Sequence, residues 1–422
     1  MTTTINNEHK KLNVPNKREQ NQTCLDSAER EGLSPNGIVP TLRFPEFQGE
    51  WEKCKVSDLL DFYSTNSLSW DKLEYGTTNI QNLHYGLIHV GLPTMVDIDK
   101  DNLPNIIDGN VPKNYELCKE GDIVFADASE DTNEVAKAVE YYNLNGKKVV
   151  CGLHTIHGRD NKNKTVVGYK GYAFSSMSFH HQIRRIAQGT KIYSINSKNF
   201  SECYVGIPSK DEQQKIADLL RLIDERIATQ NKIIDKLQSL IKGIRNEVFG
   251  KLRKNIGFNV VVGDVLDYEQ PQSYIVENTE YTNEGTPVLT ANKAFVLGYT
   301  LETDGIYDKG DCIIFDDFTL DCKYVDFPFK VKSSAIKILT TKNKELLRYT
   351  FEFLKYLDLS TEEHKRHYIA ETQNQEFIMP TEQMVKTIAH IFSTLSLRME
   401  TALKQRDVFE KQKQYLLRQM FI

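Results

Sequence analysis

The sequence predicts a mixed α/β fold of the α+β class, with two globular domains separated by two long antiparallel helices that form an intramolecular coiled coil. Three observations predict it. A heptad seam of apolar residues runs through residues 208–254, and a second copy of this segment returns 172 residues later. The stretch before each copy contains short apolar runs broken by Gly, Asn, Asp and Pro, which are typical of strands in a mixed domain.

The first long helix is marked by a cap and by an apolar repeat. Ser209 and Glu212 have the spacing of a capping box, in which each side chain satisfies a backbone N–H group of the first turn. Apolar side chains then follow in alternating steps of four and three over nearly five heptads, which favours a coiled coil. Only Gln230 interrupts the seam, whose members are Ile216, Leu220, Ile223, Ile227, Ile234, Leu237, Ile241, Ile244 and Val248.

The second long helix is a diverged copy of the first. Pro208–Phe249 aligns without a gap to Pro380–Phe421, with eight identical positions that include Phe249 and Phe421. Thr381 is a possible N-cap without a reciprocal glutamate. Arg406 and Lys413 weaken the second seam, whose other members are Ile388, Phe392, Leu395, Met399, Ala402, Phe409, Leu416 and Met420.

Equal length and matched seams favour pairing of the two helices within one chain. A helix of about 40 residues is roughly 60 Å long and alone leaves a long apolar stripe exposed. The intervening domain lets the chain return, so the second helix can cover the stripe of the first in antiparallel orientation. The alternative is two independent helices that each dimerise with another chain.

The remaining chain divides around these helices. We predict a disordered arm at 1–40, a globular domain at 41–207, the first helix at 208–254, a second domain at 255–377 and the second helix at 378–422. Short repeats join the two domains: VSDLLDFY from Val56 resembles VGDVLDYE from Val262, and EGDIVFAD from Glu120 resembles KGDCIIFDD from Lys309. Predicted strands are Asp122–Ala126, Val166–Phe174, Val288–Ala291, Cys312–Phe315 and Ser334–Leu339, and Leu346–Leu357 is predicted to be a helix.

The net charge and the number of cysteines limit the classes of protein to which the chain can belong. The net charge of −5 argues against a simple basic DNA binder, but residues 147–200 hold ten Lys and Arg and one acid, Asp160. Seven dispersed cysteines indicate free thiols and a reducing, cytoplasmic setting. No stretch approaches the about 20 apolar residues of a membrane span, and the N-terminus lacks the pattern of a signal peptide.

Motifs for catalysis and for metal binding are weak. The sequence has no phosphate loop, no dinucleotide-binding glycine motif, no nucleophile elbow and no Asn/Asp-Pro-Pro-aromatic motif of an adenine methyltransferase. The E-x-K spacing of Glu363 and Lys365 lacks an acidic partner. Cys151, His154 and His157 have zinc-ligand types, but no fourth ligand stands nearby at a familiar spacing, so we interpret them as strand and loop residues and predict no metal site.

Because the sequence lacks these catalytic motifs, we interpret the chain as a binding protein. Basic residues interleaved with Tyr169 and Tyr172 are candidates for phosphate contacts, and amide or hydroxyl groups are candidates for reading bases. The candidates in the first domain are Asn79, Gln81, Asn82, Lys147, Lys148, Arg159, Lys162, Lys164, Lys170, His180, His181, Arg184 and Arg185. Those in the second are Thr290, Asn292, Lys293, Lys323, Lys330, Lys332, Ser333, Ser334 and Lys337. For any one of them a surface or turn role is the simpler interpretation.

The order of these elements resembles the specificity subunit of type I restriction–modification systems. Leu42-Arg43-Phe44-Pro45 followed by Trp51 is similar to the opening of that family. Ile207-Pro208 with Glu212-Gln213 and Ile216-Ala217 is similar to its entry to the first conserved helix. Pro380-Thr381 with Ile388-Ala389 is a looser second copy. The resemblance covers residues 42–422.

The resemblance implies a non-catalytic DNA-recognition subunit. Residues 41–207 and 255–377 are then target-recognition domains that each read one part of a split DNA sequence, and the coiled coil sets the unread spacer. Implied partners are double-stranded DNA, two methyltransferase subunits and, through them, restriction subunits. S-adenosylmethionine, ATP and magnesium are implied on those partners, with no cofactor on this chain and no membrane. The alternatives are a stand-alone DNA methyltransferase or nuclease, and a coiled-coil scaffold that reads no sequence.

Overall fold

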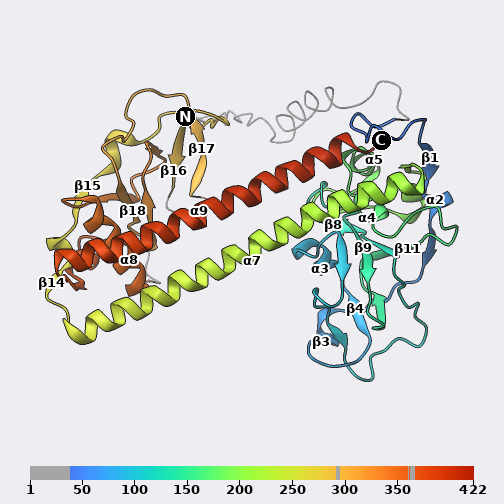
Figure 1. The fold of residues 1–422 in the computed structure, drawn as a ribbon, viewed down its shortest axis with the longest axis horizontal. Coiled ribbons are helices and arrows are strands. Elements are labelled where there is room, and N and C mark those ends of the chain that lie inside the picture. Colours follow the sequence, from blue (N-terminus) through green and yellow to red (C-terminus); the bar gives the residue numbers. More distant parts are fainter. Residues whose placement is uncertain (1–38, 291–294, 360, 362–365) are drawn as a thin grey trace, which may run out of the picture. The chain divides into compact units, whose positions relative to one another are not determined.

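The protein is described by a computed structural model at residues 39–290, 295–359, 361 and 366–422. These residues form two compact units (Figure 1). Unit 1 contains residues 39–228 and 407–422, and unit 2 contains the described residues of Thr229–Arg406. The predicted arm at 1–40 lies outside the described residues except for its last two positions. Among the described helices, none is both long and apolar enough to cross a bilayer.

Unit 1 is built on a five-stranded and a four-stranded sheet. The first has the order β2-β11-β7-β9-β5, and its strands are β2 Asp61–Tyr63, β11 Thr155–Arg159, β7 Ile123–Ala126, β9 Ala138–Asn143 and β5 Met95–Asp97. The second has the order β10-β4-β6-β3, formed by β10 Val149–Cys151, β4 Gln81–Leu83, β6 Asn105–Ile106 and β3 Leu73–Glu74. Two-stranded ladders join β1 Glu52–Lys55 to β13 Tyr204–Ile207 and β8 Ala128–Ser129 to β12 Tyr193–Ser194.

Short helices connect these strands, and all of them except η1 contribute buried side chains. They are α2 Val56–Leu59, η1 Trp70–Lys72, α3 Tyr85–Val90, α4 Tyr169–Phe174, α5 Met177–Ile186 and α6 Ser197–Ser201. The predicted strand Val166–Phe174 is wrong, because this segment forms α4. Every residue of α4 is buried, and the helix begins after Gly168 in a left-handed conformation. An apolar run that is buried on all sides carries no periodicity by which a strand can be told from a helix.

Unit 2 repeats the plan with fewer elements. Its four-stranded sheet has the order β15-β21-β18-β19, with β15 Asp267–Glu269, β21 Ile336–Thr340, β18 Cys312–Asp316 and β19 Cys322–Val325. Its three-stranded sheet is formed by β17 Val296–Thr300, β16 Thr286–Leu289 and β20 Lys330–Val331, and a ladder joins β14 Val260–Val261 to β22 Glu376–Phe377. The helices are η2 Val262–Asp264, η3 Pro271–Tyr274, α8 Lys344–Leu357 and η4 Thr372–Asn374.

The strand order shows the internal duplication that the short sequence repeats indicated. In unit 1, β2-β11-β7-β9 are neighbours and all pair antiparallel, as do β15-β21-β18-β19 in unit 2. The repeat EGDIVFAD contains β7 and KGDCIIFDD contains β18, so the matching sequences occupy matching strands. The smaller sheets match too, because β4 pairs parallel with β10 and β16 pairs parallel with β20.

Two long helices contribute to both units. Helix α7 spans Lys210–Asn255 and helix α9 spans Glu382–Gln419. In unit 1, Ile216 and Leu220 share a hydrophobic cluster with Leu416 and Met420. Further along α7, Arg226 lies over the ring of Phe409. Later residues of α7 therefore contact earlier residues of α9, which is the order expected of antiparallel helices. The predicted antiparallel pairing is therefore confirmed within unit 1.

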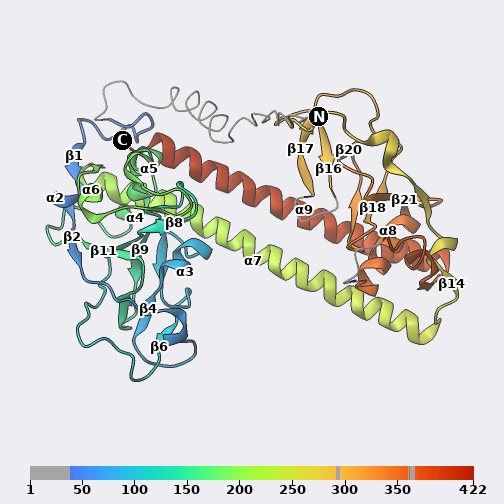
Figure 2. The same ribbon diagram turned by 180° about the vertical axis from the view of Figure 1, so that it is seen from behind.

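In unit 2 the other halves of the same helices share a second cluster. Ile241, Ile244 and Phe249 of α7 pack with the side chains of α9 and α8. Figure 2 shows α8 beside the first turns of α9, as Figure 1 does from the other side. All 14 seam residues named for the coiled coil are buried or half-buried: Ile216, Leu220, Ile223, Ile227, Ile234, Leu237, Ile241, Ile244, Ile388, Phe392, Leu395, Met399, Phe409 and Leu416.

The predicted capping box forms only in part. The backbone N–H of Glu212 donates to Ser209 Oγ at 3.4 Å, but the Glu212 carboxylate does not turn back to the cap. It accepts two hydrogen bonds from the Arg43 guanidinium, at 2.7 and 2.8 Å, and one from Trp51 Nε1 at 3.3 Å. This carboxylate therefore ties the opening segment of unit 1 to the start of α7.

Candidate nucleic-acid interface

The parallel strand pair of the smaller sheet ends at a polar surface in both units. In unit 1, the Gly152 amide that follows β10 donates to Leu83 O at the end of β4, at 2.9 Å. In unit 2, the Lys332 amide that follows β20 donates to Leu289 O at the end of β16, at 3.0 Å. We call these equivalent surfaces the carboxyl edges of the two units, because the C-terminal ends of parallel strands meet there.

Aromatic and imidazole rings gather at the carboxyl edge of unit 1. The His84 ring lies 4.6 Å from Trp70 and 4.8 Å from Tyr85, measured between centroids. Tyr85 in turn contacts the rings of His89 and His154, at 5.9 and 5.2 Å. These five residues, the ring cluster, come from η1, α3 and the turn after β10.

Two members of the ring cluster are exposed, whereas the other three are buried or half-buried. Trp70 is 45% exposed, and the side chain of His154 is 50% exposed. His154 has a φ of +54°, a left-handed conformation that costs free energy in a residue other than glycine. Its Nδ1 lies 3.1 Å from Asp127 Oδ1, which fixes the orientation of the ring. The edge thus offers stacking faces and polar atoms on a rigid support.

The carboxyl edge of unit 2 carries hydroxyl and cationic groups. Lys332 and Ser333 are exposed, and Arg366 donates to Ser334 Oγ at 3.4 Å. The Arg366 guanidinium also lies 5.7 Å from the Phe318 ring, and its side chain is 49% exposed. Thr290 follows β16 at this edge, whereas the predicted residues Asn292 and Lys293 lie outside the described residues.

The predicted amide readers of unit 1 are held inside the sheet. Asn82 is fully buried, and its Oδ1 accepts from Asn66 Nδ2 at 2.7 Å. Gln81 is 8% exposed and donates to Leu103 O. Asn79 donates to Asp108 Oδ1 at 2.9 Å and lies before β4, away from the carboxyl edge. We therefore withdraw Gln81 and Asn82 as base contacts, since their side chains are enclosed by neighbouring strands.

Several predicted phosphate contacts are buried ion pairs instead. Arg159 forms two 2.8 Å hydrogen bonds with Asp122, and Lys170 lies 2.9 Å from Glu140. Lys330 pairs with Glu302 at 2.6 Å. All three side chains are under 10% exposed, as is Lys337, so we withdraw them from the DNA-contact set. A charge in a protein interior is stable only when paired, and sequence spacing did not reveal these partners.

The other basic candidates are scattered over the surface. Lys147 and Lys148 are exposed but precede β10, at the edge opposite the ring cluster. Lys162 donates to Asp58 O, and Lys164 pairs with Glu52 at 2.6 Å. Lys323 pairs with Asp321 at 3.2 Å. The structure does not gather them into one patch.

Helix α5 holds the predicted histidine–arginine strip. Burial and the nearby Arg184 lower the pKa of His180 to about 4, so its imidazole is neutral near pH 7. His181 is half-buried, Arg184 donates to Asn133 Oδ1 at 3.2 Å, and Arg185 is exposed. Of the four, Arg185 is both charged and exposed, as a phosphate contact requires.

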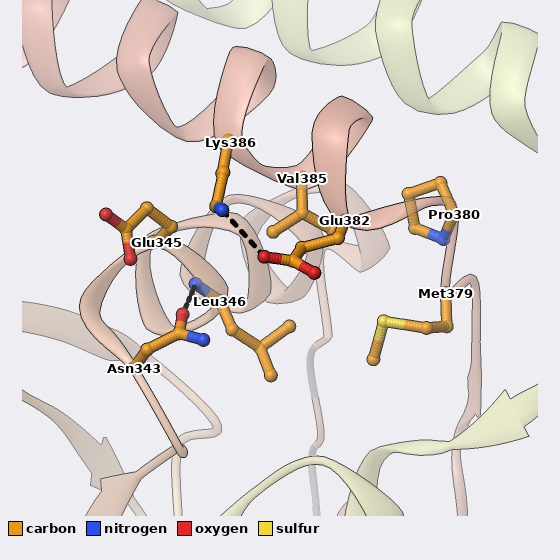
Figure 3. A pocket seen from close by; sticks show the side chains of 8 residues that line it. All are labelled: Asn343, Glu345, Leu346, Met379, Pro380, Glu382, Val385 and Lys386. Carbon is orange, nitrogen blue, oxygen red and sulfur yellow. Dashed lines mark hydrogen bonds and ion pairs between the residues drawn. The ribbon is translucent and has the colours of Figure 1, made fainter.

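A pocket of about 260 Å³ in unit 2 is a separate candidate (Figure 3). It lies between the first turns of α8 and α9, where Glu345 and Glu382 line it with Leu346 and Met379. Lys386 is ion-paired with Glu382 at 2.6 Å. Two carboxylates against one paired cation repel a phosphate, so this pocket is not a nucleic-acid site.

Sequence reasoning missed Trp70, His84, His154 and Arg366 as members of the carboxyl edges. Trp70 and His84 are 14 residues apart, and His154 joins them from beyond β10. The one available signal was the duplication itself, because Ser333 and Ser334 follow β20 as Leu153 and His154 follow β10. Aligning the two parallel strand pairs would have pointed to this edge.

Comparisons with known proteins match part of the chain by sequence and most of it by fold. Residues 49–239 match the family described as the type I restriction modification DNA specificity domain. The type I restriction enzyme EcoR124I/EcoR124II specificity subunit of Escherichia coli is 45% identical over 126 residues, which cover 28% of this chain and 31% of that one. The chain thus matches about a third of this curated relative. The fold is similar to that of a type I restriction–modification S subunit from M. genitalium, with a TM-score of 0.61 at 16% identity over 91% and 99% of the two chains.

Proposed function

We propose that this chain is a specificity subunit of a type I restriction–modification system and that it reads a split and asymmetric DNA sequence for such a complex. The observation that carries the proposal is the match of residues 49–239 to the DNA specificity domain family, together with the recurrence of the unit 1 strand order in unit 2. Two domains of the same topology can each recognise one half of a two-part DNA sequence. Because their side chains differ, the half-sites differ too.

The carboxyl edges are the surfaces that we assign to DNA. In unit 1, the exposed rings of Trp70 and His154 offer a flat contact and a hydrogen-bonding nitrogen beside it. In unit 2, Lys332, Ser333 and Arg366 offer a cation, a hydroxyl and a guanidinium that can take guanine as a bidentate acceptor. Loops that a rigid sheet positions are the usual place for such contacts.

The long helices are assigned to spacing and to assembly. Apolar side chains stand exposed along them, among them Leu222, Leu397 and Val408 at 52%, 64% and 61%. Such side chains are available to partner proteins that dock on the helices. We assign them to two methyltransferase subunits, through which restriction subunits join. The chain itself is non-catalytic in this proposal, and S-adenosylmethionine, ATP and magnesium belong to those partners.

The experiment that tests the proposal is methylome sequencing of a host that expresses this chain with its methyltransferase subunit. We expect one two-part methylated sequence with a constant spacer. A gel shift of the assembled complex at a stated, moderate salt concentration should then show preference for that sequence, since phosphate contacts alone give strong binding at low salt. Equal binding to all duplexes under these conditions contradicts the proposal and leaves the scaffold alternative. Methylation or cleavage by the purified chain alone favours the enzyme alternative.

Point substitutions test whether the carboxyl edge of each unit contacts a DNA half-site. Trp70→Ala should weaken binding through the first half-site by about 1.5–3 kcal/mol, because the apolar surface that the indole buries against the duplex is lost. Tyr142→Ala is the matched control, as this tyrosine is 41% exposed on β9 and lies outside the carboxyl edge. Lys332→Ala should reduce binding of all sequences alike and lower the salt dependence by about one counterion. Identical binding by Trp70→Ala and by the parent complex removes the ring cluster from the interface.

A further inference from the structure

Three side chains with metal-binding atoms meet in the interior of unit 1. Cys118 precedes β7, Cys151 ends β10 and His157 lies in the middle of β11. All three are buried, and their ligand atoms lie within 4.8 Å of one another. The two Sγ atoms are 3.5 Å apart. The topology therefore brings together ligands that are 33 and six residues apart in the chain.

The orientation of His157 is fixed by its ring nitrogens. Its Nε2 lies 2.7 Å from Asp122 Oδ2, while Nδ1 is buried and has no hydrogen-bond partner among the described residues. Two hydrogen bonds of 2.8 Å from Arg159 hold the Asp122 carboxylate. Because an ionised carboxylate only accepts, Nε2 carries the proton and Nδ1 presents a lone pair. An imidazole that donates one nitrogen to a carboxylate and turns the other inward is the arrangement found around protein-bound zinc.

We propose that Cys118, Cys151 and His157 bind a zinc ion that fastens β10 and β11 to the segment before β7. Two thiolates and a neutral imidazole neutralise a divalent cation and match the ligands that zinc prefers. With zinc–sulfur bonds of about 2.3 Å, tetrahedral geometry requires the sulfurs to be about 3.8 Å apart, close to their present separation. Binding forms two Zn–S bonds and one Zn–N bond and releases the two thiol protons.

Tyr141 on β9 shares a hydrophobic cluster with Cys118 and Cys151. Its buried hydroxyl has no hydrogen-bond partner among the described residues, which makes it a candidate for the fourth position. His154, which the sequence places between the other two candidates, takes no part, because it is exposed and held by Asp127. Because all three ligands are buried, the proposed site is structural, and we assign it no direct contact with DNA.

Metal analysis of the purified full-length chain tests the proposal. After expression in zinc-supplemented medium and removal of loose metal, we expect one zinc per chain by mass spectrometry. Cys118→Ser and Cys151→Ser should each lose this zinc. The matched control is Cys203→Ser, which alters another buried thiol of unit 1 and should keep it. Cobalt substitution of the parent chain should give the thiolate-to-cobalt absorption bands of a two-sulfur site.

The cobalt spectrum decides the question even where a cysteine variant fails to fold, because it uses the unaltered chain. Absence of both zinc and cobalt–thiolate bands overturns the proposal. So does a Cys118–Cys151 disulfide in protein prepared under reducing conditions. Full zinc retention in Cys118→Ser with native circular dichroism places the metal elsewhere and also overturns it.

Discussion

The ammonium of Lys413 on α9 forms a 2.6 Å ion pair with Asp224 on α7, at a seam position where the heptad pattern calls for an apolar side chain. Tyr172 of α4 donates its hydroxyl to the other Asp224 oxygen at 2.9 Å, and its ring lies 5.7 Å from Lys413 Nζ. The side chains of the pair are only 17% and 20% exposed. Lys413 interrupts the apolar seam of the second helix, but in the structure it forms a polar junction that joins α9, α7 and α4 of unit 1.

Reversal of this charge should destabilise unit 1. Lys413→Glu places two carboxylates together in a partly buried site, and we expect a loss of about 1–3 kcal/mol in the free energy of unfolding. The control is Lys411→Glu, which makes the same change at an exposed position of α9 and should cost less than about 0.5 kcal/mol. Chemical denaturation of both variants is the measurement. Equal stability of the two would show that the junction contributes nothing.

The paired phenylalanines of the two helix ends should report on the units separately. Phe249 is fully buried against Tyr349, Phe353 and Tyr356, and its counterpart Phe421 contacts Trp51 and Tyr169. Truncation to alanine leaves a cavity that costs about 3–5 kcal/mol.

Hydrogen exchange followed by mass spectrometry distinguishes the effects of these two truncations. Phe249→Ala should reduce amide protection in 241–255 and 344–357, and Phe421→Ala should reduce it in 204–228. Loss of protection throughout the chain in either variant would mean that the two units unfold as one, contrary to this expectation.

Acid should weaken unit 1 through His180. Burial lowers its pKa in the folded state to about 4, whereas an unfolded histidine titrates near 6.5. Between these values the unfolded chain binds the extra proton, so stability falls as the pH decreases from about 6.5 to about 4. This group contributes at most about 3.4 kcal/mol to the decline.

His180→Leu should flatten the decline, while His154→Leu, at an exposed ring, is the comparison variant. Unfolding free energies of the parent and both variants at pH 7 and pH 4.5 provide the measurement. If His180→Leu and the parent lose the same amount of stability, the buried imidazole is not the cause.

The features that could be predicted from the sequence depend on residues close together in the chain, whereas the missed features depend on residues far apart in it. Helices α7 and α9 follow from a local period, and Ser209 and Thr381 both accept the capping bonds expected of them. Glu212, by contrast, binds Arg43 across 169 residues, which no local pattern contains. Arg159 and Lys170 appeared to belong to a basic surface because Asp122 and Glu140 are distant in sequence. The ring cluster was missed for the same reason, since it exists only where β4 and β10 lie side by side.

The proposed role of the coiled coil as a spacer predicts how a longer coil changes the DNA target. One heptad inserted within residues 230–236 of α7, with another at the equivalent residues 402–408 of α9, keeps both seams in phase. Each helix lengthens by about 10 Å, which corresponds to about three base pairs. We expect the unread spacer to grow by about that number, with both half-sites unchanged, as measured by methylome sequencing. Insertion into α7 alone leaves the seams unmatched and should abolish methylation. An unaltered spacer with the double insertion would contradict the assignment of the helices as the ruler.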